Sequence, residues 1–267
     1  MIFKFVFRKS ICVFTLAFIL STSSVLANKH QFQWQVGEEL VYKVNWLFIR
    51  LGTLKIQVLD KLTMDGSTVY HTKMFIDSNP LLLFVNIHSV YESYINEDFY
   101  PHLFLAEEKI KGVTYWTEYR FNYADSVIYV KMTNTEDTTE VIVKQLPLDE
   151  RLQDGMSLVF YARGNVHLQK KKKLTAFYEA QKGKLDINIR GKKRKIQIAA
   201  INSSLPAYEL DGKAHFKAIA GFGGYYRGWF STDNQRVPLK AEMKVFVGKV
   251  KIELEKWKNW DPIQNDK

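Results

Sequence analysis

The glycine-rich segment Ala218–Gly228, AIAGFGGYYRG, is where residue spacing in this sequence first points to chemistry. A loop of this kind holds a phosphate when it follows a strand and opens a helix, because the amides of the helix then point at the anion. Here the glycines lead instead into Tyr225 and Tyr226 and a further predicted strand. We therefore interpret the segment as a flexible lid or a series of β-bulges.

Other residue types that do chemistry are scattered along the chain. Glu107 and Glu108 are adjacent, so in a strand they point to opposite faces and cannot act as a carboxylate pair. No GxSxG motif surrounds a serine. The histidines lack the HxH, HExxH and HxxxH spacings of metal sites, and they include His71, His88, His102, His167 and His215. We predict no catalytic residue, metal or cofactor, and an enzyme is the weaker class.

The N-terminal residues predict export. Basic residues precede an apolar run, Ile11–Leu20, and small residues then lead to Ala27. This pattern is typical of a signal peptide over residues 1–27, cleaved after Ala27, and an uncleaved anchor is the alternative. We expect a single β-rich domain over residues 28–267, in the periplasm or the outer envelope. The only cysteine, Cys12, lies in the leader, so the mature chain has no disulfide and no thiol nucleophile.

Most of the mature sequence alternates between apolar and polar residues, which is typical of strands with one buried face. In the closing segment, for example, Val250, Ile252 and Leu254 alternate with lysines and glutamates. Asp154 is a predicted N-cap for one helix, Asp154–Arg163, whose apolar residues share a face. We predict an all-β fold: a curved antiparallel sheet that forms an open or half-closed barrel, with this helix packed on it.

One predicted strand, Val113–Tyr123, carries a row of aromatic residues on one face. In a sheet such a row usually packs in the core. On the concave side of a curved sheet it could instead line a pocket for acyl chains or stack on sugars. The tentative ligand-binding residues are Tyr115, Tyr119 and Phe121 of this row, with Phe222 and Tyr225 of the glycine-rich segment.

The chain is basic, with 38 Lys and Arg against 28 Asp and Glu and a net charge of +10. Two basic clusters, Lys170–Lys173 and Arg190–Lys195, are predicted in the turns of hairpins, at the same end of two antiparallel strands. In an exported protein such clusters favour an anionic membrane surface over nucleic acid, while solvated turns are the plainer interpretation. The tentative anionic-surface patch is Lys171, Lys172, Lys192, Lys193 and Arg194.

Several short motifs resemble the DUF3108 family of exported bacterial proteins. They are Gly37-Glu38-Glu39-Leu40-Val41-Tyr42, the turn at Gly52, DGMSLVFYAR in the predicted helix, and the closing pattern of Phe230–Asp233, Arg236–Pro238 and Gly248. The resemblance covers roughly Val36 to Leu254 and implies an envelope domain with no assigned catalytic residues. The closing strands also look like the end of the periplasmic lipoprotein-carrier proteins, whose half-barrel holds acyl chains on its concave face. That second likeness is an analogy of fold.

Three functions follow from these observations. The preferred one is a non-enzymatic binding or carrier module of the periplasm or envelope for a lipid or other amphiphile, with an apolar cavity under the loops Pro80–Val85 and Gly221–Gly228. The alternative is a structural or assembly factor of the cell envelope that acts through protein contacts, with a filled interior and an exposed binding edge. A hydrolase of unknown substrate is the second alternative, and it predicts polar side chains clustered in a cleft.

Overall fold

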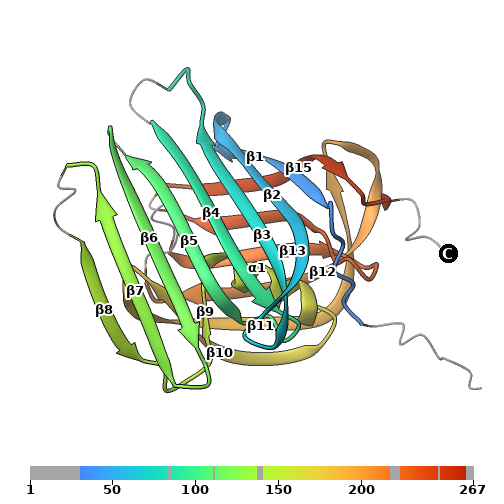
Figure 1. The fold of residues 1–267 in the computed structure, drawn as a ribbon. Helices are drawn as coiled ribbons and strands as arrows, with labels where there is room; N and C mark the ends of the chain where they lie inside the picture. Colours follow the sequence, from blue (N-terminus) through green and yellow to red (C-terminus); the bar gives the residue numbers. More distant parts are fainter. Residues whose placement is uncertain are drawn as a thin grey trace, which may run out of the picture.

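The computed structural model describes residues 31–82, 86–110, 112–136, 141–216, 223–245 and 247–262. Within these ranges the chain forms fifteen strands and one helix (Figure 1). The first eight strands are β1 (Glu39–Trp46), β2 (Ile49–Met64), β3 (Ser67–Ser78), β4 (Ile87–Asn96), β5 (Pro101–Ile110), β6 (Val113–Asn122), β7 (Val127–Asn134) and β8 (Ile142–Pro147). The rest are β9 (Leu152–Gln153), α1 (Gly155–Asn165), β10 (Gln169–Tyr178), β11 (Gln181–Ile198), β12 (Ile201–Ala214), β13 (Gly224–Ser231), β14 (Pro238–Lys244) and β15 (Lys249–Lys258).

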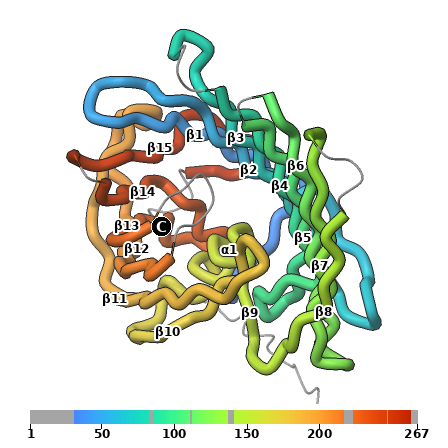
Figure 2. Tube along the Cα trace, turned by 90° about the vertical axis from the view of Figure 1, so that its left-hand side faces the viewer, coloured from blue at the N-terminus to red at the C-terminus, as the bar shows by residue number. Residues whose placement is uncertain are grey.

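All fifteen strands belong to one sheet, in the order β8-β7-β6-β5-β4-β3-β2-β1-β15-β14-β13-β12-β11-β10-β9. Neighbours are antiparallel, except that the short strand β9 is parallel to β10. The first and last strands lie side by side, because β1 pairs with β15. The two edge strands, β8 and β9, are joined by only the segment 148–151. The sheet therefore curls until its edges approach each other, which confirms the predicted open barrel (Figure 2).

The helix lies inside the curl of the sheet (Figure 2). Asp154 caps it as predicted: its Oδ1 accepts from the amides of Met156 (2.8 Å) and Ser157 (2.6 Å), and the Ser157 hydroxyl accepts from the Asp154 amide. The helix runs to Asn165, two residues beyond its predicted end. Met156 and Phe160 are fully buried in the core. A helix without a helical partner must bury its apolar side on the sheet, and this one does so from within.

The basic clusters lie elsewhere than predicted. Lys170–Lys173 lies within β10, and Arg190–Lys195 lies within the single long strand β11, so the prediction that both lie in turns is wrong. The reason is Gly191, whose φ of +63° makes a β-bulge, and the pairing of β11 with β12 shifts register there. β10 and β11 are antiparallel neighbours as expected.

The short apolar block Pro80–Val85 favours a buried helical turn, with a lid that dips into lipid as the alternative. Pro80 is exposed, and Leu81 is 85% exposed, so the prediction that the block is buried is wrong for these two residues. Both lie in a turn that follows β3, where Asn79 caps the backbone by accepting from the Leu81 amide (3.1 Å). Residues 83–85 of this block lie outside the described residues.

Candidate functional site

An apolar cavity of about 300 Å³ lies between α1 and the concave face of strands β11–β15. The helix contributes Leu158, Val159 and Ala162 as one wall. The sheet contributes the opposite wall, and Gly223 and Gly224, at the start of β13, lie at its margin. The cavity therefore lies beneath the described part of the glycine-rich segment.

The cavity exists because one cross-strand row of the sheet has small residues in its middle. The register of β12 to β15 places Leu210, Gly228, Ala241 and Ile252 in one row. Opposite side chains in such a row lie close together, so a glycine and an alanine side by side leave unfilled space under the helix.

Tyr226 forms one side of this cavity and is held by a neighbouring glycine. Its register partner is Gly212, where an added Cβ would lie 2.5 Å from the Tyr226 hydroxyl and 2.0 Å from the Asp186 carbonyl oxygen. The glycine lets the tyrosine ring lie across β12 so that its hydroxyl donates to that carbonyl (2.8 Å). Burial raises the pKa of Tyr226 well above its ordinary value, and the hydroxyl stays protonated.

The charged residues beside the cavity direct their charges elsewhere. Arg227 and Lys240 belong to its lining, but the Arg227 guanidinium lies 3.6 Å from Glu209 and the Lys240 amine 4.0 Å from Glu253. Strand alternation places both acidic partners on the outer face of the sheet. Apart from Tyr226, Arg227 and Lys240, the described residues that line the cavity are glycines and apolar residues, so it can hold an apolar group.

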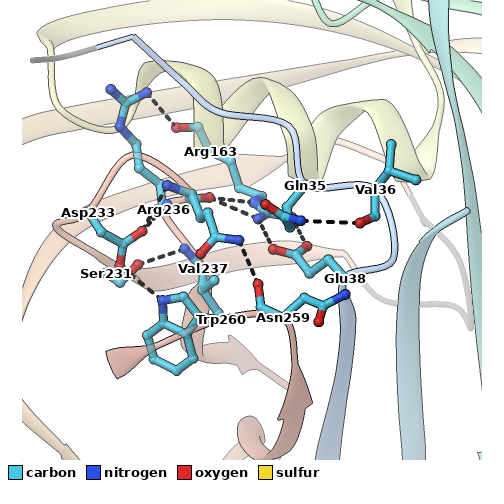
Figure 3. A network of polar contacts seen from close by, with 11 residues as sticks. Gln35, Val36, Glu38, Arg163, Ser231, Asp233, Arg236, Val237, Asn259 and Trp260 are labelled. Carbon is cyan, nitrogen blue, oxygen red and sulfur yellow. Dashed lines mark hydrogen bonds and ion pairs between the residues drawn. The ribbon is translucent and has the colours of Figure 1, made fainter. Parts of the chain in front are cut away.

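A network of buried polar contacts fixes α1 against the sheet at its C-terminal end (Figure 3). Arg163 makes two hydrogen bonds of 2.7 Å to the two carboxylate oxygens of Glu38, and the two side chains are 1% and 0% exposed. Arg163 also donates to the Gln235 carbonyl (2.8 and 3.1 Å), and Arg236 donates back to the carbonyl of Gly164 (3.0 Å). The contacts join the start of β1, the end of α1 and the β13–β14 connection.

The same network reaches the end of the described chain. Asp233 accepts from the amides of Gln235 (2.8 Å) and Arg236 (3.0 Å) and from the Trp260 indole (3.0 Å). Asn259 donates to the Gly37 carbonyl (2.9 Å). Three of the motifs noted in the sequence, which contain Glu38, Arg163 and the segment 230–238, thus meet in one place.

The family model of DUF3108, a protein family of unknown function, matches residues 41–255. The chain belongs to the DUF3108 family. The match includes Arg163 and the segment 230–238 of the network that positions α1, and Glu38 lies three residues before it begins.

The DUF3108 chain is also similar to solved structures at low sequence identity. It shares 12% identity and a TM-score of 0.58 with a beta-barrel-like protein of the domain of unknown function DUF1849 from Brucella abortus, over 86% of this chain and 99% of that one. This likeness shows the fold. A candidate exported protein with a YmcC-like fold from Bacteroides fragilis is similar at 9% identity and a TM-score of 0.38, over 86% of this chain and 100% of that one. No curated protein matches the sequence.

The aromatic row of this DUF3108 protein faces the concave side, and its members differ in burial. Tyr119 and Phe121 are each 1% exposed and pack against Phe177, with ring centroids 4.9 and 6.0 Å apart. Tyr115 is 38% exposed. Tyr115 and Tyr119 line a second cavity, of about 260 Å³, which is separate from the one under α1.

Of the two tentative residues of the glycine-rich segment, only Tyr225 is described, and it does not join them. Tyr225 is 59% exposed, and its ring lies 5.2 Å from the Lys213 amine. Because side chains alternate along β13, Tyr225 points to the outer face while its neighbour Tyr226 lines the cavity. Tyr225 is therefore not among the residues that line either cavity, and its role in ligand binding stays a prediction. Phe222 lies outside the described residues.

The residues of the tentative anionic-surface patch lie on the adjacent strands β10 and β11, where Lys171 and Lys172 point to opposite faces, and some of their charges are already compensated. Arg194 lies 3.1 Å from Glu209, a carboxylate that also has Arg190 at 3.7 Å. Lys172 lies over the ring of Tyr161 at 5.6 Å, and Lys193 lies over the ring of Tyr208 at 5.7 Å. All five patch residues are exposed, including Lys171 and Lys192.

The row of small residues that opens the cavity was not predicted from the sequence. Gly228 was assigned to the glycine-rich segment, but it lies within β13, where a glycine is a signal for close approach or for missing side-chain volume. Ala241 lies opposite it only because of the register between β13 and β14. Within the described ranges no group of three potential metal ligands comes together, and no helix there is long and apolar enough to cross a membrane.

Proposed function

We propose that this protein is a non-enzymatic binding or carrier module for a lipid or other amphiphile in the cell envelope. The observation that carries the proposal is the apolar cavity between α1 and the row containing Gly228 and Ala241. The signal peptide predicted over residues 1–27 supports an envelope location.

The size and chemistry of the cavity limit the ligand to an amphiphile. Its volume of about 300 Å³ lies at the small end of ligand pockets, which span roughly 300–1,000 Å³. A single hydrocarbon chain or ring system fits, whereas a whole phospholipid does not. Because the polar ends of Arg227 and Lys240 are engaged outside the cavity, a head group stays at the margin near Gly223.

The test fills the cavity by replacing Ala241 with Leu. Leucine adds roughly three carbon atoms, and displacing three ligand methylenes at ~0.8 kcal/mol each weakens the binding of a fluorescent fatty acid by about 50-fold. The matched control is Ala200→Leu in the exposed β11–β12 turn, which leaves affinity unchanged. Equal affinity in the two variants contradicts the proposal. Native mass spectrometry of the gently purified protein gives a second measurement, since a carrier retains a co-purified amphiphile.

A specific observation also favours the alternative, an assembly factor that acts through protein contacts. β8 lies at one edge of the sheet, and apolar side chains are exposed at its start: Val141, just before the strand, is 44% exposed, and Ile142 and Val143 within it are 37% and 71% exposed. An edge strand offers unpaired backbone groups to an extended segment of another protein. Crosslinking in cells through a photoreactive residue at position 143 tests this alternative, because an assembly factor yields one protein partner there, whereas a carrier whose ligand lies under α1 yields none.

A further inference from the structure

The second cavity, of about 260 Å³, lies on the concave face where the β10–β11 turn meets strands β5–β7. Aromatic rings form much of its wall, and they belong to Phe104, Tyr115, Tyr119 and Tyr178. Two carboxylates, Glu108 and Glu179, complete it. None of the described residues that line it is Lys, Arg or His, although the chain as a whole carries a net charge of +10.

The carboxylate of Glu108 is held in place on the concave side. Glu108 follows Glu107, which lines a groove on the outer face, so strand alternation turns Glu108 inward. The Tyr91 hydroxyl donates to Glu108 Oε1 at 2.6 Å. This single hydrogen bond leaves most of the acceptor capacity of the carboxylate directed at the cavity.

The second carboxylate comes from a tight turn with an unusual backbone. Glu179 and Ala180 connect β10 to β11 with φ values of +50° and +54°, a conformation that normally takes Asn-Gly. The Ala180 amide donates to the Tyr119 hydroxyl at 3.0 Å, which fixes the turn against β6. Backbone strain of this kind is retained where the surrounding structure requires it, and here the turn brings Glu179 to the edge of the cavity.

The phenols around these carboxylates remain neutral. Burial, with a contribution from Glu108 and Glu179, raises the pKa of Tyr119 to about 12, and the same causes raise the pKa of Tyr178. Neutral aromatic rings present a negative face, so rings and carboxylates act in the same electrostatic sense. Such a cavity attracts a cation with an apolar surface and disfavours an anion or a neutral chain, which would leave the carboxylates without compensation.

We propose that this cavity is a binding site for a small organic cation of the alkylammonium or quaternary ammonium class. Glu108 and Glu179 balance the charge, and the rings of Tyr115, Tyr119 and Tyr178 contact the alkyl groups. The site is independent of the apolar cavity under α1 and of the function proposed for it, because the two cavities share no lining residue.

The experiment compares choline with its neutral carbon isostere, 3,3-dimethyl-1-butanol, by isothermal titration calorimetry on the mature protein. The two probes have the same shape, so the difference between their affinities reports on charge. We expect saturable choline binding that is at least about tenfold tighter than binding of the isostere. Equal affinities overturn the proposal, since they indicate a merely apolar pocket, and so does the absence of choline binding.

Variants then assign the site. Glu108→Gln keeps an acceptor for Tyr91 and removes the charge, and we expect it to weaken choline binding by about tenfold. The matched control is Glu107→Gln, which makes the same change one residue earlier on the outer face and leaves choline affinity unchanged. Tyr115→Leu weakens binding, whereas Tyr115→Phe keeps the ring and retains it. Equal losses in Glu108→Gln and Glu107→Gln overturn the assignment, and Ala241→Leu is expected to leave choline affinity unchanged.

Discussion

Removing one partner of the buried pair Glu38–Arg163 is expected to destabilise the protein strongly. Both side chains are at most 1% exposed, and Arg163 makes hydrogen bonds to both Glu38 oxygens and to the Gln235 carbonyl. Glu38→Gln leaves a buried guanidinium without its counter-charge, and Arg163→Met leaves a buried carboxylate. Each single change is expected to lower the free energy of unfolding by about 3–5 kcal/mol.

The assay is guanidinium denaturation followed by tryptophan fluorescence, with the two single variants and the double variant forming a cycle. The double variant removes both charges of the pair, so its cost is expected to be about 2 kcal/mol smaller than the sum of the single costs. The matched control is Arg50→Met, because Arg50 also makes two hydrogen bonds to one carboxylate, that of Glu255, at 2.8 and 2.9 Å. The Arg50 side chain is 44% exposed, and its loss costs less than about 1 kcal/mol. If Glu38→Gln costs no more than Arg50→Met, the reasoning from burial is refuted.

Two further predictions concern charge elsewhere. Burial raises the pKa of Asp154 to about 6. The contribution of Asp154 to the free energy of unfolding is therefore full below about pH 4 and is lost as the pH rises through 6. Asp154→Asn keeps a helix cap and is expected to remove about 3 kcal/mol of this pH dependence. Burial also lowers the pKa of His102, and this shift makes the free energy of unfolding rise with pH over the same range. The measurement is therefore denaturation of both the variant and the wild type at pH 5 and pH 7. For the basic patch, reversing the charges is expected to abolish sedimentation of the protein with anionic liposomes while its melting temperature stays nearly constant. Unchanged sedimentation of the variant contradicts a membrane role. The residues reversed to Glu are Lys171, Lys172, Lys192 and Lys193.

The elements of this fold were predictable because their signals are local. Alternation marks the strands, and Asp154 with the apolar residues after it marks α1. The face of the sheet on which each side chain lies was harder to predict, because it depends on bulges and on the register of strand pairing. Tyr225 lies on the outer face, and the bulge at Gly191 keeps the cluster Arg190–Lys195 within β11. The cavities depend on pairings between distant segments. Nothing in the local sequence places Gly228 beside Ala241, or Glu179 beside Glu108.

The position of α1 explains why the protein buries the charged pair Glu38 and Arg163 despite the free energy of desolvation. α1 spans a cavity whose opposite wall is Gly228 and Ala241, and hydrophobic burial alone would draw the helix onto that wall and close the space. The helix is instead fixed at both ends. Asp154 accepts from the Ser93 hydroxyl (2.5 Å) at the N-terminal end, and Arg163 is bound to Glu38 and the Gln235 carbonyl at the C-terminal end.

Directional polar contacts of this kind specify where an element lies more strictly than apolar packing does, even when they add little net stability. The double variant of Glu38→Gln and Arg163→Met separates these two effects. If the pair serves to position α1, the double variant loses affinity for a fluorescent fatty acid by more than its loss of stability explains, because the helix settles toward Ala241. An unchanged affinity would mean that packing alone keeps the cavity open, and the pair would then be a feature of folding stability only.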